Sequence, residues 1–343
     1  MLAGSNYLDL AGDERVLAAA RAAVDEYGGA AGGSRLINGN LALHEELEAE
    51  LARFAGHRAA LLFSTGYMAN LGVLATLAGP DDAIVSDSLN HASIVDACRL
   101  SRAQTRVFRH NDPRDLERVA SGLAGFRRRI LVTDGVYSMD GDVARLAELV
   151  PVARAHDMIV VLDDAHGLGA LGPSGRGTAE LEGVEVDVAV GNLGKALGSF
   201  GAYVACSETV RSWLINAARS FIFTCGLAPA AAGAARAALQ IASAEPQRRK
   251  TLHERAEQLR AGLRDAGFDT GASTTHIVPA IVGDNARVMA LCEAALERGI
   301  YAQGIRFPSV PRGTERIRFT PTSAHKADEI AFAVRTFAEL RSP

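Results

Sequence analysis

The stretch Met158-Ile-Val-Val-Leu-Asp163-Asp164-Ala-His166-Gly167 decides the fold that we expect for this chain. Five apolar residues that lead directly into two carboxylates are typical of a strand buried on both faces of a parallel sheet. Open α/β sheets carry their functional sites at the carboxyl ends of such strands. We therefore expect Asp163, Asp164 and His166 to lie near a site, although one of the two acids is also expected to cap the next helix.

A second stretch, Val190-Gly-Asn192-Leu-Gly-Lys195-Ala-Leu-Gly198, places a lysine between glycines just after the apolar run Val186–Val190. A lysine at a strand end can reach into a cleft, and burial that lowers its pKa from about 10.4 favours imine chemistry. A solvated lysine in a turn is the alternative. Because Asp163 can keep a pyridine nitrogen protonated, the two stretches together predict a site for pyridoxal 5'-phosphate (PLP). His166 is expected to contact the phenolic oxygen of that ring.

More polar groups follow other expected strands. Ser64–Tyr67 lie between a strand at 59–63 and a helix at 68–77. Free N–H groups at this helix start suit the cofactor phosphate at Gly66, with Tyr67 beside the ring, unless the turn is an ordinary one. His91 follows the strand that starts at Ile84, and could stack on the ring and act as acid or base, or could simply cap a helix. Ser138 follows the strand 130–133 and is placed to donate a hydrogen bond.

The alternation of strands and helices from 59 to 190 predicts an α/β fold with a mainly parallel central sheet covered by helices. Further strands are expected at 202–206 and in Phe221–Gly226, where Thr224 is a candidate phosphate ligand. The break at Glu245-Pro246 marks a domain boundary. We expect an N-terminal segment (1–35), a large PLP-binding domain (36–245) and a smaller α+β C-terminal domain (246–343).

Arg318 stands in an apolar strand of the C-terminal part, after the proline-bounded loop 304–311. A charge in such a strand is unfavourable unless it is paired. Bidentate capture of a substrate carboxylate would offset this cost, and an internal salt bridge is the alternative.

Three other motifs in the sequence offer alternatives to this interpretation. Gly167-Leu-Gly169-Ala-Leu-Gly172 matches the dinucleotide fingerprint G-x-G-x-x-G, but Pro173 and the glycines after it interrupt the long helix that the fingerprint needs. A phosphate-binding Walker motif at 191–196 fails because Ala196 replaces Ser or Thr. Asp163, Asp164 and His166 could instead bind a metal ion, although no H-E-x-x-H pattern accompanies them.

The composition is that of an ordinary globular protein. Of 343 residues, 48% are hydrophobic and 22% charged, and the net charge is -4. This balance gives no reason to expect a nucleic-acid or membrane partner. Four cysteines without a C-x-x-C pair suit a reduced cytoplasm, and no secretory signal is expected from the first residues.

Taken in order, five motifs closely resemble those of the α-oxoamine synthases, PLP-dependent enzymes of the aspartate-aminotransferase fold type. They are Ser-Thr-Gly-Tyr-Met-Ala-Asn (64–70), Asn-His-Ala-Ser (90–93), Tyr-Ser-Met-Asp-Gly-Asp (137–142), Asp-Asp-Ala-His-Gly (163–167) and Gly-Lys-Ala-Leu-Gly (194–198). The resemblance runs from Asn6 to His325.

This resemblance implies PLP-dependent transferase fold type I, a homodimer with a shared active site, and condensation of an amino acid with an acyl-CoA or acyl-ACP. Residues 283–285 and 305–311 look like the branch of biotin biosynthesis, which uses L-alanine and a pimeloyl thioester; glycine or serine with another acyl-CoA is the alternative.

The resemblance also implies residue roles. Lys195 would hold the cofactor covalently, Asp163 and His166 would hold its ring nitrogen and phenolic oxygen, and His91 would stack on the ring. Gly66, Tyr67 and Ser138 would line the cofactor pocket. Ser309, Arg306 and Arg318 would contact substrate, and residues near Thr224 would reach the partner's phosphate. The chain departs from the family pattern at three positions, with Asn192 in place of Thr or Ser, Cys225 in place of Thr and Ser5 in place of Asn. A substrate-contacting arginine of the family lies ahead of the first residue of this sequence.

Overall fold

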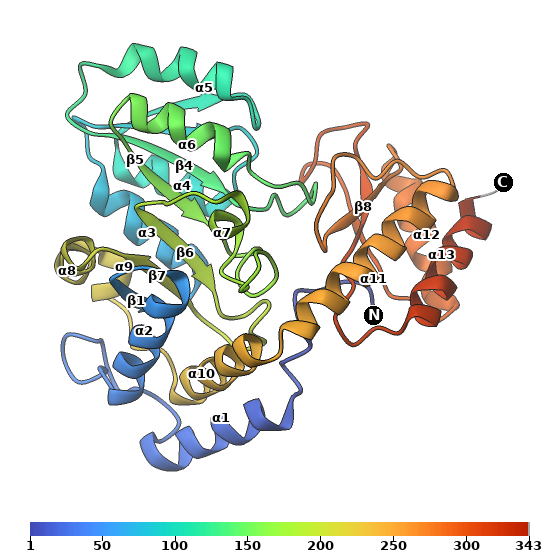
Figure 1. Ribbon diagram of the computed structural model, residues 1–343, viewed down its shortest axis with the longest axis horizontal. Helices are drawn as coiled ribbons and strands as arrows, with labels where there is room; N and C mark the ends of the chain where they lie inside the picture. Colours follow the sequence, from blue (N-terminus) through green and yellow to red (C-terminus); the bar gives the residue numbers. More distant parts are fainter. Residues whose placement is uncertain (342–343) are drawn as a thin grey trace. The chain divides into compact units, whose positions relative to one another are not determined.

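The computed structural model describes residues 1–341, which form two compact units (Figure 1). The larger unit comprises residues 10–135 and 144–244. The smaller unit comprises residues 1–9, 136–143 and 245–341. No helix within residues 1–341 combines the length and the apolar character that crossing a membrane requires.

A seven-stranded sheet organises the larger unit, in the order β1-β7-β6-β5-β4-β2-β3. Its strands are β1 (Ala59–Phe63), β2 (Ala83–Asp87), β3 (Gln104–Phe108), β4 (Arg129–Asp134), β5 (Met158–Asp163), β6 (Val188–Asn192) and β7 (Ala202–Cys206). Neighbours from β3 to β6 pair in parallel, whereas β7 is antiparallel to both β6 and β1. Every strand except β7 therefore runs in the same direction. This confirms the mainly parallel sheet and brings the carboxyl ends of β1, β2, β4, β5 and β6 to one edge.

Helices cover this sheet because its strands are apolar on both faces. The helices of this unit are α1 (Glu14–Tyr27), α2 (Ala42–Ala55), α3 (Gly66–Leu77), α4 (Ala92–Ser101), α5 (Pro113–Ala120), α6 (Leu146–Ala155), α7 (Thr178–Glu182), α8 (Glu208–Ala217), α9 (Arg219–Ile222) and α10 (Pro229–Ala244), with a 3-10 turn at Ser121–Leu123. Side chains of α3, α4, α8 and α9 share one buried cluster with alternate residues of the strands, such as Leu61 and Phe63.

The prediction of a strand that ends in Phe221–Gly226 is wrong. Residues 219–222 form the short helix α9, and Cys225 makes only an isolated bridge with Ser34. Phe221 is buried and packs edge-on against Phe63 at 5.7 Å between ring centroids, and the hydroxyl of Ser220 donates to the carbonyl of Met68. These contacts hold the segment against the core although it does not pair as a strand of the sheet.

The smaller unit is an α+β arrangement. A three-stranded antiparallel sheet of β8 (Val278–Ile281), β10 (Arg316–Phe319) and β9 (Gln303–Ile305) packs with α11 (Pro246–Asp265), α12 (Asn285–Glu297) and α13 (Ala327–Arg341). Phe319 and Phe337 meet edge-on in its core at 4.9 Å. The strand β9 is absent from the sequence-based expectation because three residues are too few to show a period.

Candidate active site

The carboxyl edge of the large sheet brings three predicted residues together. Asp163 ends β5 and is buried, and Lys195 is half-buried in the turn that follows β6. His91 is the residue immediately before α4. Burial lowers the pKa of the His91 imidazole below 6.5, with Asp163 opposing this shift and Lys195 adding to it. Asp163 and Lys195 therefore both lie within electrostatic reach of His91, as a shared PLP site requires.

Lys195 differs from the other lysines of the chain. The sequence contains three lysines, and both Lys250 and Lys326 are exposed. The turn around Lys195 is held by backbone hydrogen bonds, among them Gly198 N–H to the Lys195 carbonyl (2.9 Å) and Ser199 N–H to the Leu193 carbonyl (2.9 Å). These bonds fix the backbone from which the Lys195 side chain extends.

The carboxylate of Asp163 is held from two sides. Nδ2 of Asn70 on α3 donates to Oδ2 (2.6 Å), and the backbone N–H of Ala165 donates to Oδ1 (3.0 Å). Both partners are donors, so they fix the orientation of the carboxylate. An oriented carboxylate is the acceptor that a protonated pyridine nitrogen needs, so this residue fits PLP.

Asp164 has a different task. Its oxygens accept from the N–H and the hydroxyl of Thr178, each at 2.6 Å. Thr178 is the first residue of α7, which confirms that one acid of the pair serves the next helix. Burial raises the pKa of Asp164 to about 6. A Cβ at Gly167 would lie 2.0 Å from Oδ1 of Asp164, so the glycine of the dinucleotide fingerprint makes room for this carboxylate. The five-residue α7 begins only at Thr178, and no long helix opens at 167–172.

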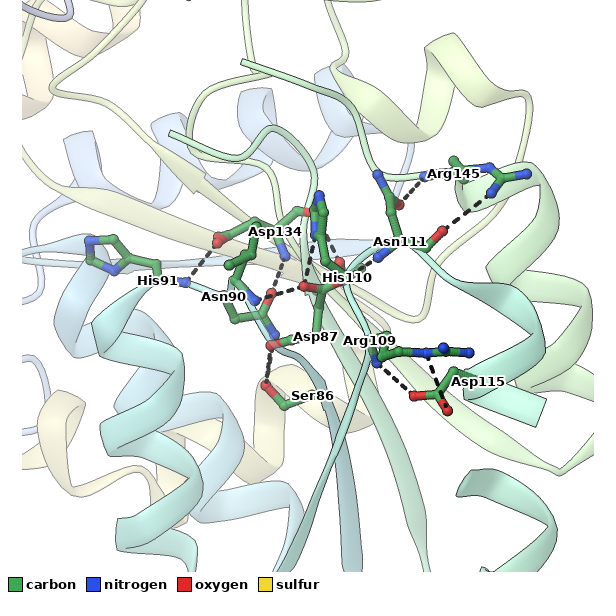
Figure 2. A network of polar contacts seen from close by, with 12 residues as sticks. Ser86, Asp87, Asn90, His91, Arg109, His110, Asn111, Asp115, Asp134 and Arg145 are labelled. Carbon is green, nitrogen blue, oxygen red and sulfur yellow. Dashed lines mark hydrogen bonds and ion pairs between the residues drawn. The ribbon is translucent and has the colours of Figure 1, made fainter. Parts of the chain in front are cut away.

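His91 is anchored at both its ring and its backbone. The ring Nδ1 accepts from the N–H of Ser93 (3.2 Å) and lies 2.7 Å from the Ser93 hydroxyl, so His91 does cap α4. Its backbone N–H donates to Oδ2 of Asp134 (2.7 Å), and the ring extends away from that contact (Figure 2). The capping alternative is thus confirmed, and it leaves the rest of the ring available to the site.

Asn90 ties the same loop to the sheet. Its Oδ1 accepts from the N–H of Asp134 (2.8 Å), and its Nδ2 donates to Ser86 Oγ (2.8 Å) and to the Val132 carbonyl (2.9 Å) (Figure 2). Asp134 is also the register partner of Asp163 on the neighbouring strand. Burial, reinforced by the charge of Asp163, raises the pKa of Asp134 well above 3.8.

The start of α3 offers donors for an anion. The hydroxyl of Thr65 accepts from Met68 N–H (3.1 Å), while the N–H groups of Gly66 and Tyr67 have no acceptor within residues 1–341. Oδ1 of Asn192 accepts from Gly194 N–H (2.8 Å), and its Nδ2 would lie 3.1 Å from a Cβ at Gly66. These three donors fit a phosphate, and the amide of Asn192 can donate a hydrogen bond where the family pattern has a hydroxyl.

Three further candidates, Tyr67, His166 and Thr224, lie in the larger unit. Tyr67 is exposed and donates its hydroxyl to Asp96 on α4 (2.5 Å). Thr224 and His166 are half-buried. The carbonyl of Cys225, next to Thr224, accepts from Ser64 Oγ (3.3 Å) beside the start of α3.

Ser138, Arg306, Ser309 and Arg318 belong to the smaller unit. Nε of Arg318 donates to the carbonyl of Ser138, and within residues 1–341 no carboxylate forms an ion pair with Arg318. The internal salt bridge is instead made by Arg316, with Asp140 at 2.6 Å. Arg306 and Ser309 lie in an exposed loop, where the N–H of Ser309 donates to the Arg306 carbonyl (2.8 Å). Among the described residues, no group of three or more His, Cys, Asp or Glu side chains is arranged to hold a metal ion.

Four residues at the site were not singled out from the sequence: Asn70, Asn90, Ser93 and Asp134. Asn70 left a signal, since it is the one polar residue in the run Met68–Leu74 and a buried amide needs partners. Asp134 ends a strand, as Asp163 does, and the same strand-end argument applies to it.

Comparison with known proteins agrees with this geometry. Residues 1–337 match the family described as aminotransferase class I and II. The 8-amino-7-oxononanoate synthase of Geobacter metallireducens is 48% identical over 344 residues, covering 99% of this chain and 88% of the relative. A serine palmitoyltransferase of S. paucimobilis, solved with PLP and myriocin, superposes with a TM-score of 0.96 at 34% identity and covers 99% of this chain and 86% of its own. The 8-amino-7-oxononanoate synthase of Francisella tularensis has a TM-score of 0.85 at 26% identity, covering 98% of this chain and 96% of its own.

A family match over nearly the whole chain, together with relatives of this identity, also settles the expected cofactor and fold type. The chain belongs to the aminotransferase class I and II family, and within it to the PLP-dependent acyltransferases known as α-oxoamine synthases.

Proposed function

We propose that the chain condenses L-alanine with pimeloyl-CoA or pimeloyl-ACP and releases 8-amino-7-oxononanoate, CO2 and the free thiol, as a step of biotin biosynthesis. The observation that carries the proposal is the meeting of Lys195, Asp163 and His91 at one edge of the sheet. The names of relatives up to 48% identical support this choice of substrates and product.

Each group at the sheet edge has a task in this reaction. Bound PLP supplies a protonated ring that accepts electron density from the α-carbon of the amino acid. Asp163 holds the proton on the ring nitrogen, with Asn70 and Ala165 fixing its orientation. Lys195 would anchor the cofactor, and its Nζ would also be the base for the α-proton. His91 would lie against the ring and donate a proton in the later steps, and His166 would contact the phenolic oxygen.

The phosphate is bound by the start of α3. We assign the N–H groups of Gly66 and Tyr67 and Nδ2 of Asn192 as its donors. Thr224 is proposed to reach the phosphate bound to the partner subunit.

We also propose Ser138 as a cofactor contact, and Arg306, Ser309 and Arg318 as substrate contacts. Arg318 supports this assignment, because a half-buried guanidinium with no carboxylate partner in residues 1–341 suits a substrate carboxylate.

We propose a homodimer with a shared active site, working in the cytoplasm. Large apolar side chains that are exposed near the site elements support the dimer: Leu36 (50%), Ile37 (83%), Phe200 (57%) and Phe223 (70%). The four cysteines are free thiols, in keeping with a reducing compartment. The division into residues 1–35, 36–245 and 246–343 also stays a proposal, which limited proteolysis tests. Light scattering on the purified protein tests the dimer.

A thiol-release screen tests the activity. Purified protein with PLP is given L-alanine, glycine or L-serine together with pimeloyl-CoA, acetyl-CoA or palmitoyl-CoA, and free CoA is followed. The proposal expects the highest kcat/KM for L-alanine with pimeloyl-CoA, and its loss in Lys195→Ala but not in Lys250→Ala. Preference for glycine or L-serine with another thioester would instead favour a different member of the family.

A further inference from the structure

A chain of hydrogen bonds links Asp163 to the ring of His91. Nδ2 of Asn70 donates to Oδ2 of Asp163 (2.6 Å) and to Oγ of Ser93 (2.8 Å). Oγ of Ser93 lies 2.7 Å from Nδ1 of His91. Three elements, α3, β5 and the start of α4, are therefore joined through one buried amide.

The chemistry of donors and acceptors gives this chain a single direction. Both oxygens of the Asp163 carboxylate accept hydrogen bonds, so the amide nitrogen of Asn70, and not its oxygen, faces Asp163. The second hydrogen of Nδ2 is then donated to Ser93 Oγ, which leaves the hydroxyl hydrogen of Ser93 for Nδ1 of His91. The backbone N–H of Ser93 also points at Nδ1 (3.2 Å). Two donors aimed at Nδ1 leave no room for a proton on that nitrogen, so neutral His91 carries its proton on Nε2.

Stability does not explain why an amide occupies this position. Asn70 is only 1% exposed, and within residues 1–341 its Oδ1 has no hydrogen-bond partner. A buried acceptor without a partner is unfavourable, and such groups in native proteins call for a reason. The two hydrogens that Asn70 donates supply that reason. The dipole of α4 also favours neutral His91, because a positive charge on the capping ring would lie at the positively polarised N-terminus of this helix.

We propose that Asn70 and Ser93 are positioning residues that hold His91 as the Nε2–H tautomer and couple the orientation of its ring to the carboxylate of Asp163. The outer nitrogen of the ring is then a proton donor whenever His91 is neutral. This inference concerns the site of the proposed function, yet the tautomer is measured without any substrate. The two can therefore fail separately.

The tautomer is read by nitrogen NMR of the full-length protein labelled with 15N-histidine, with and without PLP. The chain has nine histidines, and the spectrum of His91→Gln identifies the two ring nitrogens of His91. Ser93→Ala removes the hydroxyl donor, and Asn70→Ala removes the amide that orients it. Ser101→Ala is the matched control, because this buried serine of α4 donates to the Cys98 carbonyl (2.7 Å) and makes no contact with His91.

We expect Nδ1 of His91 to be unprotonated and Nε2 protonated in the unaltered protein at neutral pH. In Ser93→Ala, the ratio of the Nε2–H to the Nδ1–H form should fall roughly 2- to 10-fold, as loss of one neutral hydrogen bond predicts. Asn70→Ala should lower the same ratio and should also weaken PLP binding in absorbance titrations, because Asp163 loses a donor. Ser101→Ala should change neither. A protonated Nδ1 in the unaltered protein, or a ratio in both site variants equal to that of the control, would overturn the proposal.

Discussion

Substitution of Asp164 by Asn should change how stability depends on pH. The carboxyl group is 5% exposed, and burial raises its pKa from 3.8 to about 6. Because the folded pKa lies above the unfolded one, the contribution to stability is complete below about pH 4 and is lost as the pH rises through about 6. At about 1.4 kcal/mol per pKa unit, the whole loss is about 3 kcal/mol, of which about 1 kcal/mol falls between pH 5 and pH 7.

The comparison of the two proteins isolates this carboxyl group, since all other titrating groups are shared. Relative to the unaltered protein, Asp164→Asn should gain about 1 kcal/mol in the free energy of unfolding from pH 5 to pH 7. Reversible urea unfolding of PLP-free protein, followed by the fluorescence of the single tryptophan, Trp213, measures this gain. Asp157→Asn is the control, because its side chain is 89% exposed. A gain of zero, or a relative loss toward pH 7, would refute the reasoning.

Three further substitutions test other parts of the fold and the site. Gly167→Ala should lower the melting temperature strongly, because the new Cβ would lie 2.0 Å from Asp164 Oδ1, whereas Gly122→Ala, with nothing within 4 Å, should be nearly neutral in the same thermal scan. Glu48→Ala should cost about 3 to 5 kcal/mol in urea unfolding, since it leaves the buried guanidinium of Arg35, now 2.8 Å from Glu48, without its carboxylate partner; an unchanged midpoint would contradict this. Asn192→Ala should weaken PLP binding about tenfold or more through loss of a charge-assisted donor, while Asn192→Thr should largely retain it, as equilibrium absorbance titration would show; equal affinity of all three proteins would exclude Asn192 from the phosphate site.

Long apolar strands and their carboxyl ends were predictable from the sequence. The bounds expected for β1 and β7 agree with the structure, because each has a clear stop signal or a run of uniform character. The placement of Asp163, His91 and Lys195 near one another followed from the rule that parallel strands end at one edge. That rule needs only the order of elements and no knowledge of contacts.

Hydrogen-bond partners were harder to predict from the sequence. The pairing of Asn70 with both Asp163 and Ser93 joins positions 93 and 23 residues apart, and nothing local to Asn70 specifies it. The apolar run Phe-Ile-Phe predicts a strand at 221–226, whereas in the structure Phe221 joins a buried cluster of helix and strand residues and packs against Phe63. Short apolar runs carry too few residues to distinguish the two periods.

The central claim is that the amine of Lys195 binds the cofactor and that Asp163 holds the ring nitrogen of the same cofactor. Reductive labelling tests this claim most directly. The protein is saturated with PLP, reduced with borohydride and digested, and the modified peptides are identified by mass. One label per chain on the peptide containing Lys195, lost in Lys195→Ala and weakened in Asp163→Ala, is the predicted result. Label on Lys250 or Lys326 in place of Lys195, or binding unchanged in Lys195→Ala, would contradict the account.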